Sequence, residues 1–214
     1  MINFSHNDDL YIIGDICDRG GESEKIYIDV MARSNVFCLK GNHELMAEKV
    51  LPYMLGFRKM PPQRIYNADY NVWLQNGGNE TINAIYRCRE KTQMKICDFI
   101  EEMPLIKDGL KIGDREFILV HAGLHGYTPD RILSEYLPYD LLWARPDYDL
   151  KLWEDENKFL VVGHTPTMFL SKMHLGRIYK GKGSFINIDC GEAYRKHGGR
   201  LGCLCLDTLE EFYV

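Results

Sequence analysis

The stretch that decides the fold is LYIIGDICDRG, residues 10–20. An apolar run rises to Gly14, and Asp15, Asp18 and Arg19 follow it directly. Short runs rich in Ile and Tyr that stop at glycine are typical of buried β-strands. Two carboxylates and a guanidinium directly after a buried strand predict a loop that carries functional side chains.

The composition is that of an ordinary globular protein. The chain has 214 residues, 45% of them hydrophobic, and a net charge of −5. This length suffices for one sizeable domain. No long basic run provides an electrostatic footprint for nucleic acid, and no apolar stretch approaches the ~20 residues that span a bilayer. Seven scattered cysteines and no visible leader favour reduced thiols. We expect a cytoplasmic protein with no nucleic-acid or membrane partner.

Further apolar runs, each ending in polar residues or glycine, predict strands along the rest of the chain. Residues 20–34 lie between the first two runs and predict a short helix, which gives a β-α-β unit. The closing third returns to strands. We therefore predict an α/β (α+β) fold of two mixed sheets packed face to face as a sandwich, with helices outside. The predicted strand runs are LYIIGD, VFCLKGNHE, EFILVHAG, KFLVVGHTP, SFINIDCG and GCLCLD.

The region from about 44 to 106 differs in character, because its apolar residues recur at helical spacing. We predict helices over HELMAEKVLPYML and over NETINAIYRCREKTQMKICDFIEEM, with Thr81 or Asn79 as the cap of the second. Between them, Asn-Gly-Gly marks a tight turn. The aromatic residues Tyr66, Tyr70 and Trp73 are core anchors or, alternatively, surfaces that stack a base. No linker flanks the region, so we interpret residues 1–214 as one domain with a helical insert.

Four predicted strands release potential metal ligands at their ends. They deliver Asp15, Asn42, His121 and His164. Loops at the carboxyl ends of strands gather in one crevice of an open α/β sheet. Carboxylate, amide and imidazole donors together suit Mn²⁺, Fe or Zn²⁺. A single histidine after a strand would be weak evidence for a metal site. The evidence is strong because four strand ends in one chain carry potential ligands.

These motifs, taken in order, resemble those of the calcineurin-like metallophosphoesterases of the phosphoprotein phosphatase type. That family carries GDxxDRG, GNHE, a His-Gly/Ala-Gly motif and GHT, and this chain has GDICDRG, GNHE, HAG and GHTP in the same order. The resemblance runs from Leu10 to the end, including LLWARPD at 141–147 and the closing NIDCG. It is closest to the bacterial serine/threonine protein phosphatase type.

The resemblance implies a role for each motif residue. Asp15 would bridge two divalent metal ions, most readily Mn²⁺, and the second ion would be completed by Asn42, His121 and His164. His43 would be the general acid, oriented by Asp18. The phosphate would be gripped by Arg19 and Arg145. Glu44 is expected to orient the backbone of its motif without touching substrate, and Asp189 to be structural. No motif includes His125, His174 or His197.

One family motif has no counterpart here. An Asp-x-His that binds the first metal is expected a β-α unit before GDxxDRG, but only fourteen residues precede Asp15. The cluster SHNDD at 5–9 is interpreted as a loop leading into the first strand. We expect either that the natural protein carries the motif upstream, which we favour, or that the chain binds phosphorylated partners without turnover. Without that strand, exposed apolar surface and lower stability are expected.

The substrate is left open between classes. Relatives of this kind cleave phosphoserine or phosphothreonine in proteins, and others split dinucleoside tetraphosphates. We expect a phosphomonoester hydrolase that acts on a phosphoprotein, with a dinucleoside tetraphosphate hydrolase, which acts on a phosphorylated small molecule, as the alternative. A catalytically impaired phosphate-binding protein is the third possibility.

Overall fold

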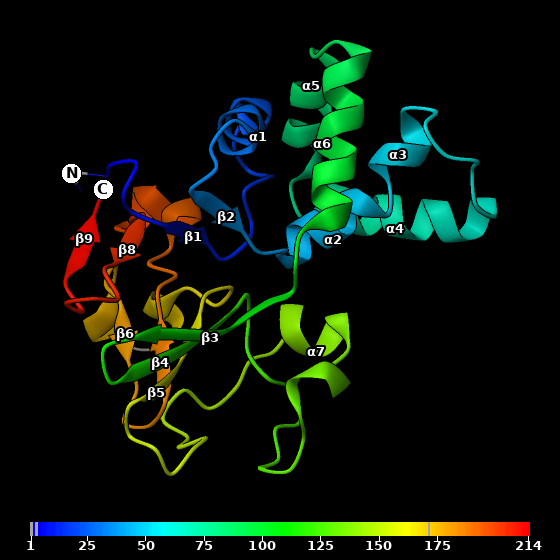
Figure 1. Cartoon of the computed structure of the whole chain (residues 1–214). Coiled ribbons are helices and arrows are strands. Elements are labelled where there is room, and N and C mark those ends of the chain that lie inside the picture. The colour runs from blue at the N-terminus through cyan, green and yellow to red at the C-terminus, as the bar shows by residue number, and fades with distance from the viewer. Residues whose placement is uncertain (1, 3, 171) are drawn as a thin grey trace. The chain divides into compact units, whose positions relative to one another are not determined.

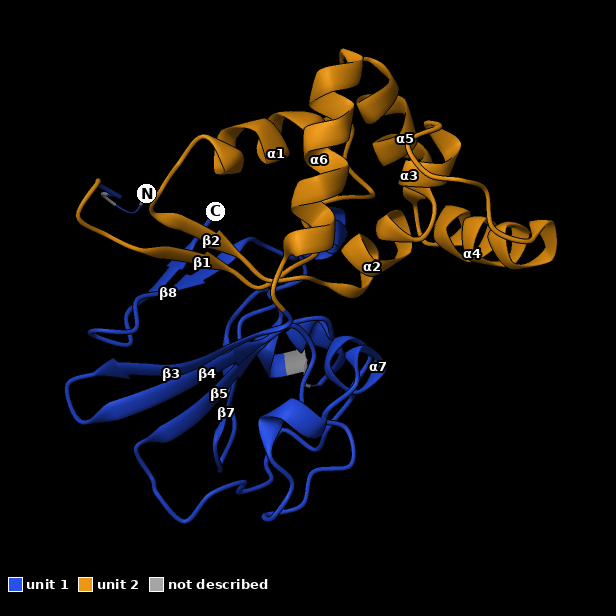
Figure 2. Ribbon diagram, turned by 45° about the vertical axis from the view of Figure 1, so that its right-hand side comes forward, with its two compact units in different colours: residues 1–5, 105–214 blue, residues 6–104 orange. Residues whose placement is uncertain are grey.

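The computed structural model describes residues 2, 4–170 and 172–214, apart from the side chain of Lys172. The chain divides into two compact units (Figure 2). Unit 1 comprises residues 1–5 and 105–214, and unit 2 comprises residues 6–104. Among the helices of the described residues, none has the length and apolar character needed to cross a membrane.

Unit 2 begins with the predicted β-α-β unit. Strand β1 (Leu10–Ile12) pairs in parallel with β2 (Val36–Cys38), and α1 (Ser23–Met31) connects them. The helix buries Tyr27 and Val30 on one face and exposes Ile26 and Ile28. The short-helix prediction for residues 20–34 is therefore confirmed. Parallel pairing places the carboxyl ends of β1 and β2 side by side, and these are the ends that release Asp15 and Asn42.

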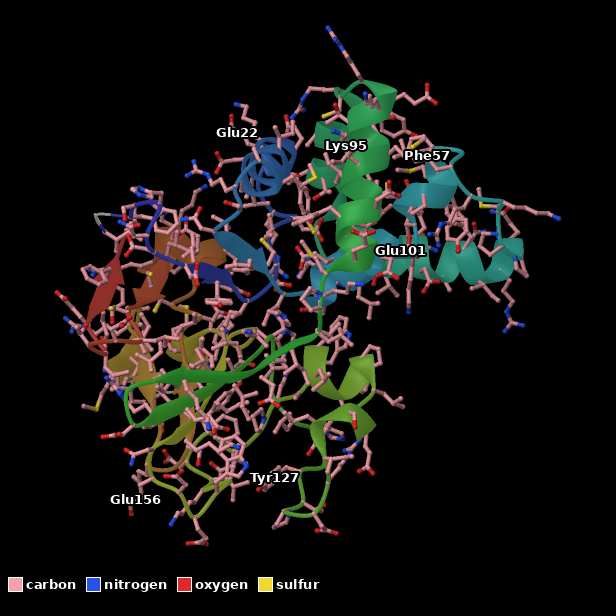
Figure 3. The ribbon with its side chains drawn as sticks, viewed as in Figure 1. Glu22, Phe57, Lys95, Glu101, Tyr127 and Glu156 are labelled. Atoms are coloured by element: carbon pink, nitrogen blue, oxygen red, sulfur yellow. The ribbon has the colours of Figure 1, made fainter. Side chains whose placement is uncertain are left out.

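The rest of unit 2 is helical, as predicted for the insert. Helix α1 packs against α5 and α6, and α2 packs against α4 and α6. The loop after α3 is tied to α6 by an ion pair between Arg58, which follows Phe57, and Glu101 (Figure 3). The five helices of this region are α2 (Asn42–Glu48), α3 (Leu51–Met54), α4 (Gln63–Gln75), α5 (Gly78–Tyr86) and α6 (Glu90–Glu102).

The helix boundaries within the insert were predicted incorrectly. The first predicted helix is divided into α2 and α3, with Pro52 in the first turn of α3. The second is divided into α5 and α6, because Arg89 adopts an extended conformation before α6 begins. The segment between the two predicted helices contains the whole of α4, which was not predicted, and ends in the predicted Asn-Gly-Gly turn, where Gly77 has a positive φ. Only Trp73 is buried along α4, so its helical periodicity is weak.

Unit 1 is built on a five-stranded mixed sheet in the order β3-β4-β5-β7-β6 (Figure 1). Its central strands β4, β5 and β7 are parallel and buried, and the two edge strands are antiparallel to their neighbours. The apolar runs of β4, β5 and β7 were predicted as strands and are confirmed. The strands are β3 (Ile106–Ile112), β4 (Arg115–Val120), β5 (Lys158–Val162), β6 (Tyr179–Lys180) and β7 (Phe185–Asn187).

A second, two-stranded antiparallel sheet in unit 1 pairs β8 (Gly202–Leu204) with β9 (Glu211–Tyr213). We predicted β8 but not β3, β6 or β9, each of which lies at the edge of its sheet. Mixed sheets with helices are thus confirmed as the fold class, whereas the sandwich and the single domain stay predictions. The remaining helices are η1 (Leu133–Glu135), α7 (Pro138–Leu142), η2 (Thr167–Phe169), η3 (Lys172–His174) and η4 (Glu192–His197).

Candidate functional site

The loop that follows β1 has an unusual backbone. Gly14, Asp15, Asp18 and Arg19 all adopt positive φ, at 95°, 58°, 69° and 57°. Three of these four residues carry a Cβ, for which the left-handed region is sparsely populated. Residues held in this region cost free energy and persist only where the surroundings fix them. The first motif is therefore a strained loop that needs external support.

Glu44 supplies much of that support from the first turn of α2. Its Oε2 accepts hydrogen bonds from the backbone nitrogens of Asp15 (2.7 Å) and Gly41 (2.8 Å). Its Oε1 accepts from those of Ile16 (2.7 Å) and Cys17 (3.2 Å). The side chain is fully buried. One carboxylate thus holds the backbone of the first motif against the second, as the expected orienting role of Glu44 requires.

Gly41 is required where the two motifs of unit 2 meet. A Cβ at this position would lie 2.3 Å from Asp15 Oδ1 and 2.5 Å from the Asp15 backbone nitrogen. The Asp15 Oδ1 atom accepts a hydrogen bond from the backbone nitrogen of His43 at 3.2 Å. The close approach allowed by glycine therefore brings Asp15 to the N-terminus of α2, next to Asn42.

His43 lies between a carboxylate and a guanidinium. Its ring Nδ1 donates to Asp18 Oδ2 at 2.5 Å, and its Nε2 accepts from Arg19 Nη2 at 3.0 Å. A carboxylate only accepts and a guanidinium only donates, so the neutral ring carries its proton on Nδ1. The imidazole is 3% exposed. Unit 2 therefore brings together the predicted acid, its predicted partner and one predicted phosphate-binding arginine.

The surroundings favour the protonated form of His43. Burial by itself would lower the pKa of the ring, but the hydrogen bond to Asp18 and the charges of Asp15 and Asp18 outweigh it. The net result is a pKa raised above the ordinary histidine value, against a smaller opposing contribution from Arg19. A raised pKa keeps the proton on a group that has to donate it near neutral pH.

Asp18 has two further partners that we did not predict. The indole Nε1 of Trp73 donates to both of its carboxylate oxygens, at 3.1 and 2.9 Å. The hydroxyl of Thr81 donates to Oδ1 at 2.6 Å and accepts from the Asp18 backbone nitrogen at 2.8 Å. The expectation that Thr81 or Asn79 caps α5 was wrong, because the helix begins at Gly78 and Thr81 lies in its first turn. Trp73 is buried in the core, which agrees with the core-anchor alternative and not with the base-stacking one.

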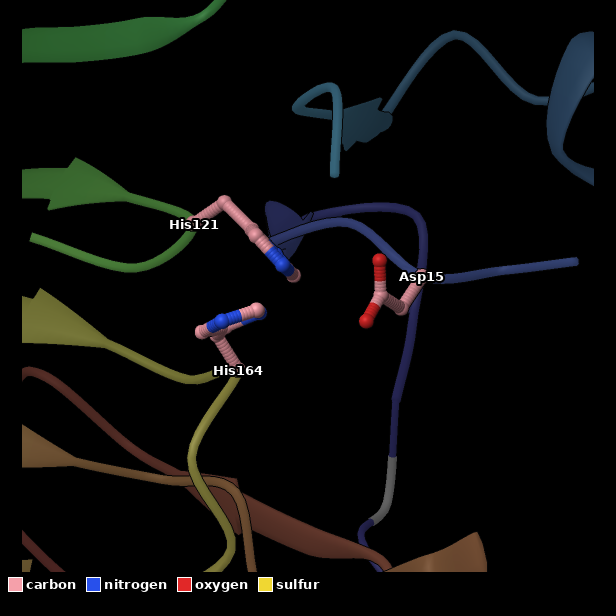
Figure 4. Close-up of side chains that lie close together, drawn as sticks. All are labelled: Asp15, His121 and His164. Carbon is pink, nitrogen blue, oxygen red and sulfur yellow. The ribbon is translucent and has the colours of Figure 1, made fainter. Parts of the chain in front are cut away.

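In unit 1, two imidazoles leave the same edge of the five-stranded sheet. His121 follows β4 and His164 follows β5, which is the parallel neighbour of β4. The backbone nitrogen of Gly163 donates to the His121 carbonyl at 2.7 Å, which continues the ladder to the strand ends. The ring centroids lie 5.2 Å apart in an edge-to-face arrangement. Figure 4 shows both rings, together with the Asp15 side chain of unit 2.

The turn after β5 also holds the second predicted arginine. Arg145 Nη1 donates to the hydroxyl of Thr165 at 3.1 Å. The buried Asn187 of β7 donates to the Thr165 carbonyl at 2.9 Å and accepts from the Asp189 backbone nitrogen at 2.9 Å. Asp189 Oδ1 accepts from the Gly191 backbone nitrogen at 2.9 Å, which agrees with a structural role. Unit 1 thus brings Arg145 next to the His164 turn.

Three comparisons with known proteins bear on this site. The family model for calcineurin-like phosphoesterases matches residues 2–190. The chain therefore belongs to the calcineurin-like phosphoesterase family, with no distinction of subtype. A search of the curated proteins found no match.

Two solved structures are similar to this chain at low sequence identity. A hypothetical protein from Pyrococcus horikoshii OT3 is 11% identical with a TM-score of 0.43, over 97% of this chain and 74% of that one. A metallophosphoesterase from Sphaerobacter thermophilus is 16% identical with a TM-score of 0.38, over 96% of this chain and 63% of that one.

The donor chemistry of the motif residues fits a divalent metal ion. Two imidazoles from adjacent strand ends, one carboxylate and one amide oxygen are borderline-to-hard ligands. Such a set accommodates Mn²⁺, Fe or Zn²⁺ and does not resemble the thiolate sites of copper or iron–sulfur clusters. Family membership and this donor set agree on a metal-dependent hydrolase.

Proposed function

We propose that this protein is a metal-dependent phosphomonoester hydrolase, and within that class a serine/threonine protein phosphatase. The observation that carries the proposal is the buried pair of Asp18 and His43, with Arg19 on the other ring nitrogen. A carboxylate, an imidazole and a guanidinium in series form an arrangement that can donate a proton beside a bound phosphate.

On the family resemblance of their motifs, we propose Asp15, Asn42, His121 and His164 as ligands of a divalent ion. Mn²⁺ is the first candidate, and Fe or Zn²⁺ are the alternatives. When bound, a divalent ion of this kind supplies Lewis acidity and an activated water near neutral pH. The family resemblance implies a second ion, and we assign no residues of this chain as its further ligands.

The roles of the chain's own residues follow from their contacts. Arg19 occupies the Nε2 atom of His43 in the free protein. A phosphate dianion competes for that guanidinium, because charge-assisted bonds to phosphate oxygens are stronger than a bond to a neutral ring nitrogen. Substrate binding would thereby free Nε2 to carry the proton that the leaving group needs. The family resemblance makes Arg145 of unit 1 the second proposed phosphate-binding residue.

A cysteine nucleophile is disfavoured by its environment. Cys17 lies within the first motif, but burial and the neighbouring Glu44 carboxylate raise the pKa of its thiol well above the usual value. The thiolate is the nucleophilic form, so a thiol of this kind is inert. This supports hydrolysis by water over a covalent phosphocysteine route.

The proton-donating arrangement also favours an alkyl ester as the substrate. Serine and threonine alkoxides are poor leaving groups and require protonation as the ester bond breaks. A nucleoside diphosphate leaves far more readily and gains less from a positioned acid. We therefore place phosphoserine and phosphothreonine proteins ahead of dinucleoside tetraphosphates as the substrate.

The experiment is a rate comparison with Mn²⁺ on a phosphoserine peptide and on a dinucleoside tetraphosphate. The wild type should release phosphate from the peptide, and His43→Asn should lower kcat by roughly 10²–10⁴-fold. The exposed His197 lies outside every motif, so His197→Asn is the matched control and should leave the rate unchanged.

Each of the other outcomes contradicts part of the proposal. Equal rates for the wild type and His43→Asn would exclude the acid role. Release of nucleoside diphosphate without phosphopeptide turnover would indicate the dinucleotide hydrolase. Phosphopeptide binding without turnover, lost in Arg19→Ala, would indicate the phosphate-binding protein.

A further inference from the structure

The turn between α4 and α5 contacts the first motif at three points. We name Trp73, Gly77 and Thr81 the α4–α5 clamp. Trp73 and Thr81 bind the Asp18 carboxylate, and the Gly77 carbonyl accepts from the Arg19 backbone nitrogen at 3.4 Å. All of these residues belong to unit 2. The helical insert therefore contacts both neighbours of His43.

The clamp fixes the direction in which Asp18 presents its second oxygen. A carboxylate bonded to His43 alone could turn about its terminal torsion, which is broad and weakly restrained. Here Oδ1 accepts from Thr81 at 2.6 Å, and the Trp73 indole bridges both oxygens. Trp73 and Thr81 are fully buried. With Oδ1 held in this way, Oδ2 is left directed at the Nδ1 atom of His43.

The steric fit of the turn agrees with a positioning role. A Cβ at Gly77 would lie 3.0 Å from Arg19 Cγ, and Gly77 has a φ of +97°. A Cβ at Gly78 would lie 2.7 Å from the ring of Trp73. The two adjacent glycines therefore let the turn approach both Arg19 and the indole closely. No other residue type fits both positions without displacing one of these partners.

We propose that Trp73 and Thr81 are positioning residues for the general acid. They hold the Asp18 carboxylate so that it fixes the ring orientation and tautomer of His43, and Nε2 faces the leaving group. The inference rests on the proposed function for its kinetic consequence, but the arrangement of the imidazole itself can be tested without turnover.

The kinetic test uses two substrates that differ in their need for an acid. Trp73→Phe keeps a large ring and removes the N–H donor. For an alkyl phosphate such as phosphoserine, kcat should fall about tenfold, the size expected for one lost hydrogen bond to a charged group. For an aryl phosphate, which leaves without protonation, kcat should change little, and KM should change little for both. Trp153→Phe is the matched control, because Trp153 contacts Tyr127 and Lys158 and lies outside the clamp.

The second test needs no activity. In the metal-free protein labelled with ¹⁵N, the ring nitrogen shifts of His43 report its tautomer and hydrogen bonds. Thr81→Val and Trp73→Phe should move these shifts, whereas Thr81→Ser, which restores the hydroxyl, should return them toward the wild type. The indole N–H signal of Trp73 should move in Asp18→Asn. Far-ultraviolet circular dichroism and the melting temperature establish that each variant is folded.

The outcomes separate this inference from the proposed function. An equal loss of rate on both substrates would assign Trp73 and Thr81 to stability alone and overturn the inference. Unchanged His43 shifts in folded Thr81→Val would also overturn it, even if Trp73→Phe fails to fold. A wild type without phosphatase activity would overturn the proposed function, while the predicted spectral changes would still support the arrangement of Asp18 and His43.

Discussion

The two units hold their candidate site residues by different means. In unit 1, His121 and His164 extend directly from parallel neighbouring strands, and the strand ladder continues to their backbone. In unit 2, Asp15 and Asp18 lie on a loop in which four of the six residues from Gly14 to Arg19 have positive φ. That loop is held by the buried side chain of Glu44. Regular topology places the first set, and side-chain-to-backbone bonds place the second.

The difference predicts where each half is vulnerable. A strand end loses little when one nearby side chain changes, because the ladder bonds remain. A strained loop depends on the group that fixes it, since the cost of its conformation is always present. The following variants test this contrast from the largest expected effect to the smallest.

Glu44→Gln should have the largest effect on stability. In the wild type, Glu44 Oε2 accepts from the backbone nitrogens of Asp15 and Gly41. In the variant, the NH₂ group of the glutamine takes the place of one carboxylate oxygen, so two backbone N–H donors lose their acceptor. Each buried donor left unsatisfied costs about 1–3 kcal/mol, so the free energy of unfolding should fall by about 4 kcal/mol. Denaturant unfolding measures this. Glu22→Gln, on the exposed surface, should change it by less than about 0.5 kcal/mol, and equal losses in the two variants would refute the central role of Glu44.

Gly41→Ala should come next. The added methyl group meets the Asp15 backbone nitrogen and the Glu44 carboxylate, so the two motifs of unit 2 must separate. Overpacking against backbone costs up to about 3 kcal/mol. Gly21→Ala is the matched control, because a Cβ there has nothing within 4 Å, and it should be neutral or slightly stabilising. Similar effects of the two substitutions on the melting temperature would show that the contact of Gly41 with Asp15 and Glu44 leaves room for a methyl group.

Asn187→Ala probes the corresponding buried tether of unit 1. Asn187 donates to the Thr165 carbonyl and accepts from the Asp189 backbone nitrogen. Loss of both bonds should cost about 2 kcal/mol, less than the change at Glu44, because the β4–β5 ladder still holds the His164 turn. Denaturant unfolding compares the two variants directly. A larger loss for Asn187→Ala than for Glu44→Gln would reverse the comparison between the units.

The pH dependence of stability should show the smallest effect. The pKa of His43 is raised in the folded protein, so its contribution to stability is full below the unfolded pKa. That contribution is lost as pH rises through the folded pKa. The stability of the metal-free wild type relative to His43→Gln should therefore be constant below the ordinary histidine pKa of about 6.5 and decline as the pH rises above that value. A flat or rising difference would show that burial of the ring prevails over Asp18.

Much of the site could be predicted from the sequence because its residues follow strands. His121 and His164 come directly after apolar runs that form parallel neighbours, so their proximity follows from topology. An orienting role for the Glu44 side chain was also expected, and its hydrogen bonds to backbone nitrogens of both motifs agree with that role.

The partners of Asp18 could not be predicted in the same way. Helix α4 buries only Trp73, so no apolar stripe marks the segment as a helix. The role of Thr81 depends on α5 beginning at Gly78, which sequence patterns do not fix to the residue. The break between α5 and α6 was missed because apolar spacing continues across Arg89. Long-range side-chain partners of this kind leave no periodic signal in one sequence.

The most direct test of the account is a calorimetric titration of the purified chain with Mn²⁺ after chelation. The wild type should bind the ion, and Asp15→Asn and His121→Ala should each weaken binding by more than about tenfold, while Asp9→Asn, an exposed carboxylate near β1, should bind as the wild type does. Affinity that is unchanged in Asp15→Asn, or lost equally in Asp9→Asn, would contradict the proposal that Asp15 is a ligand of the ion.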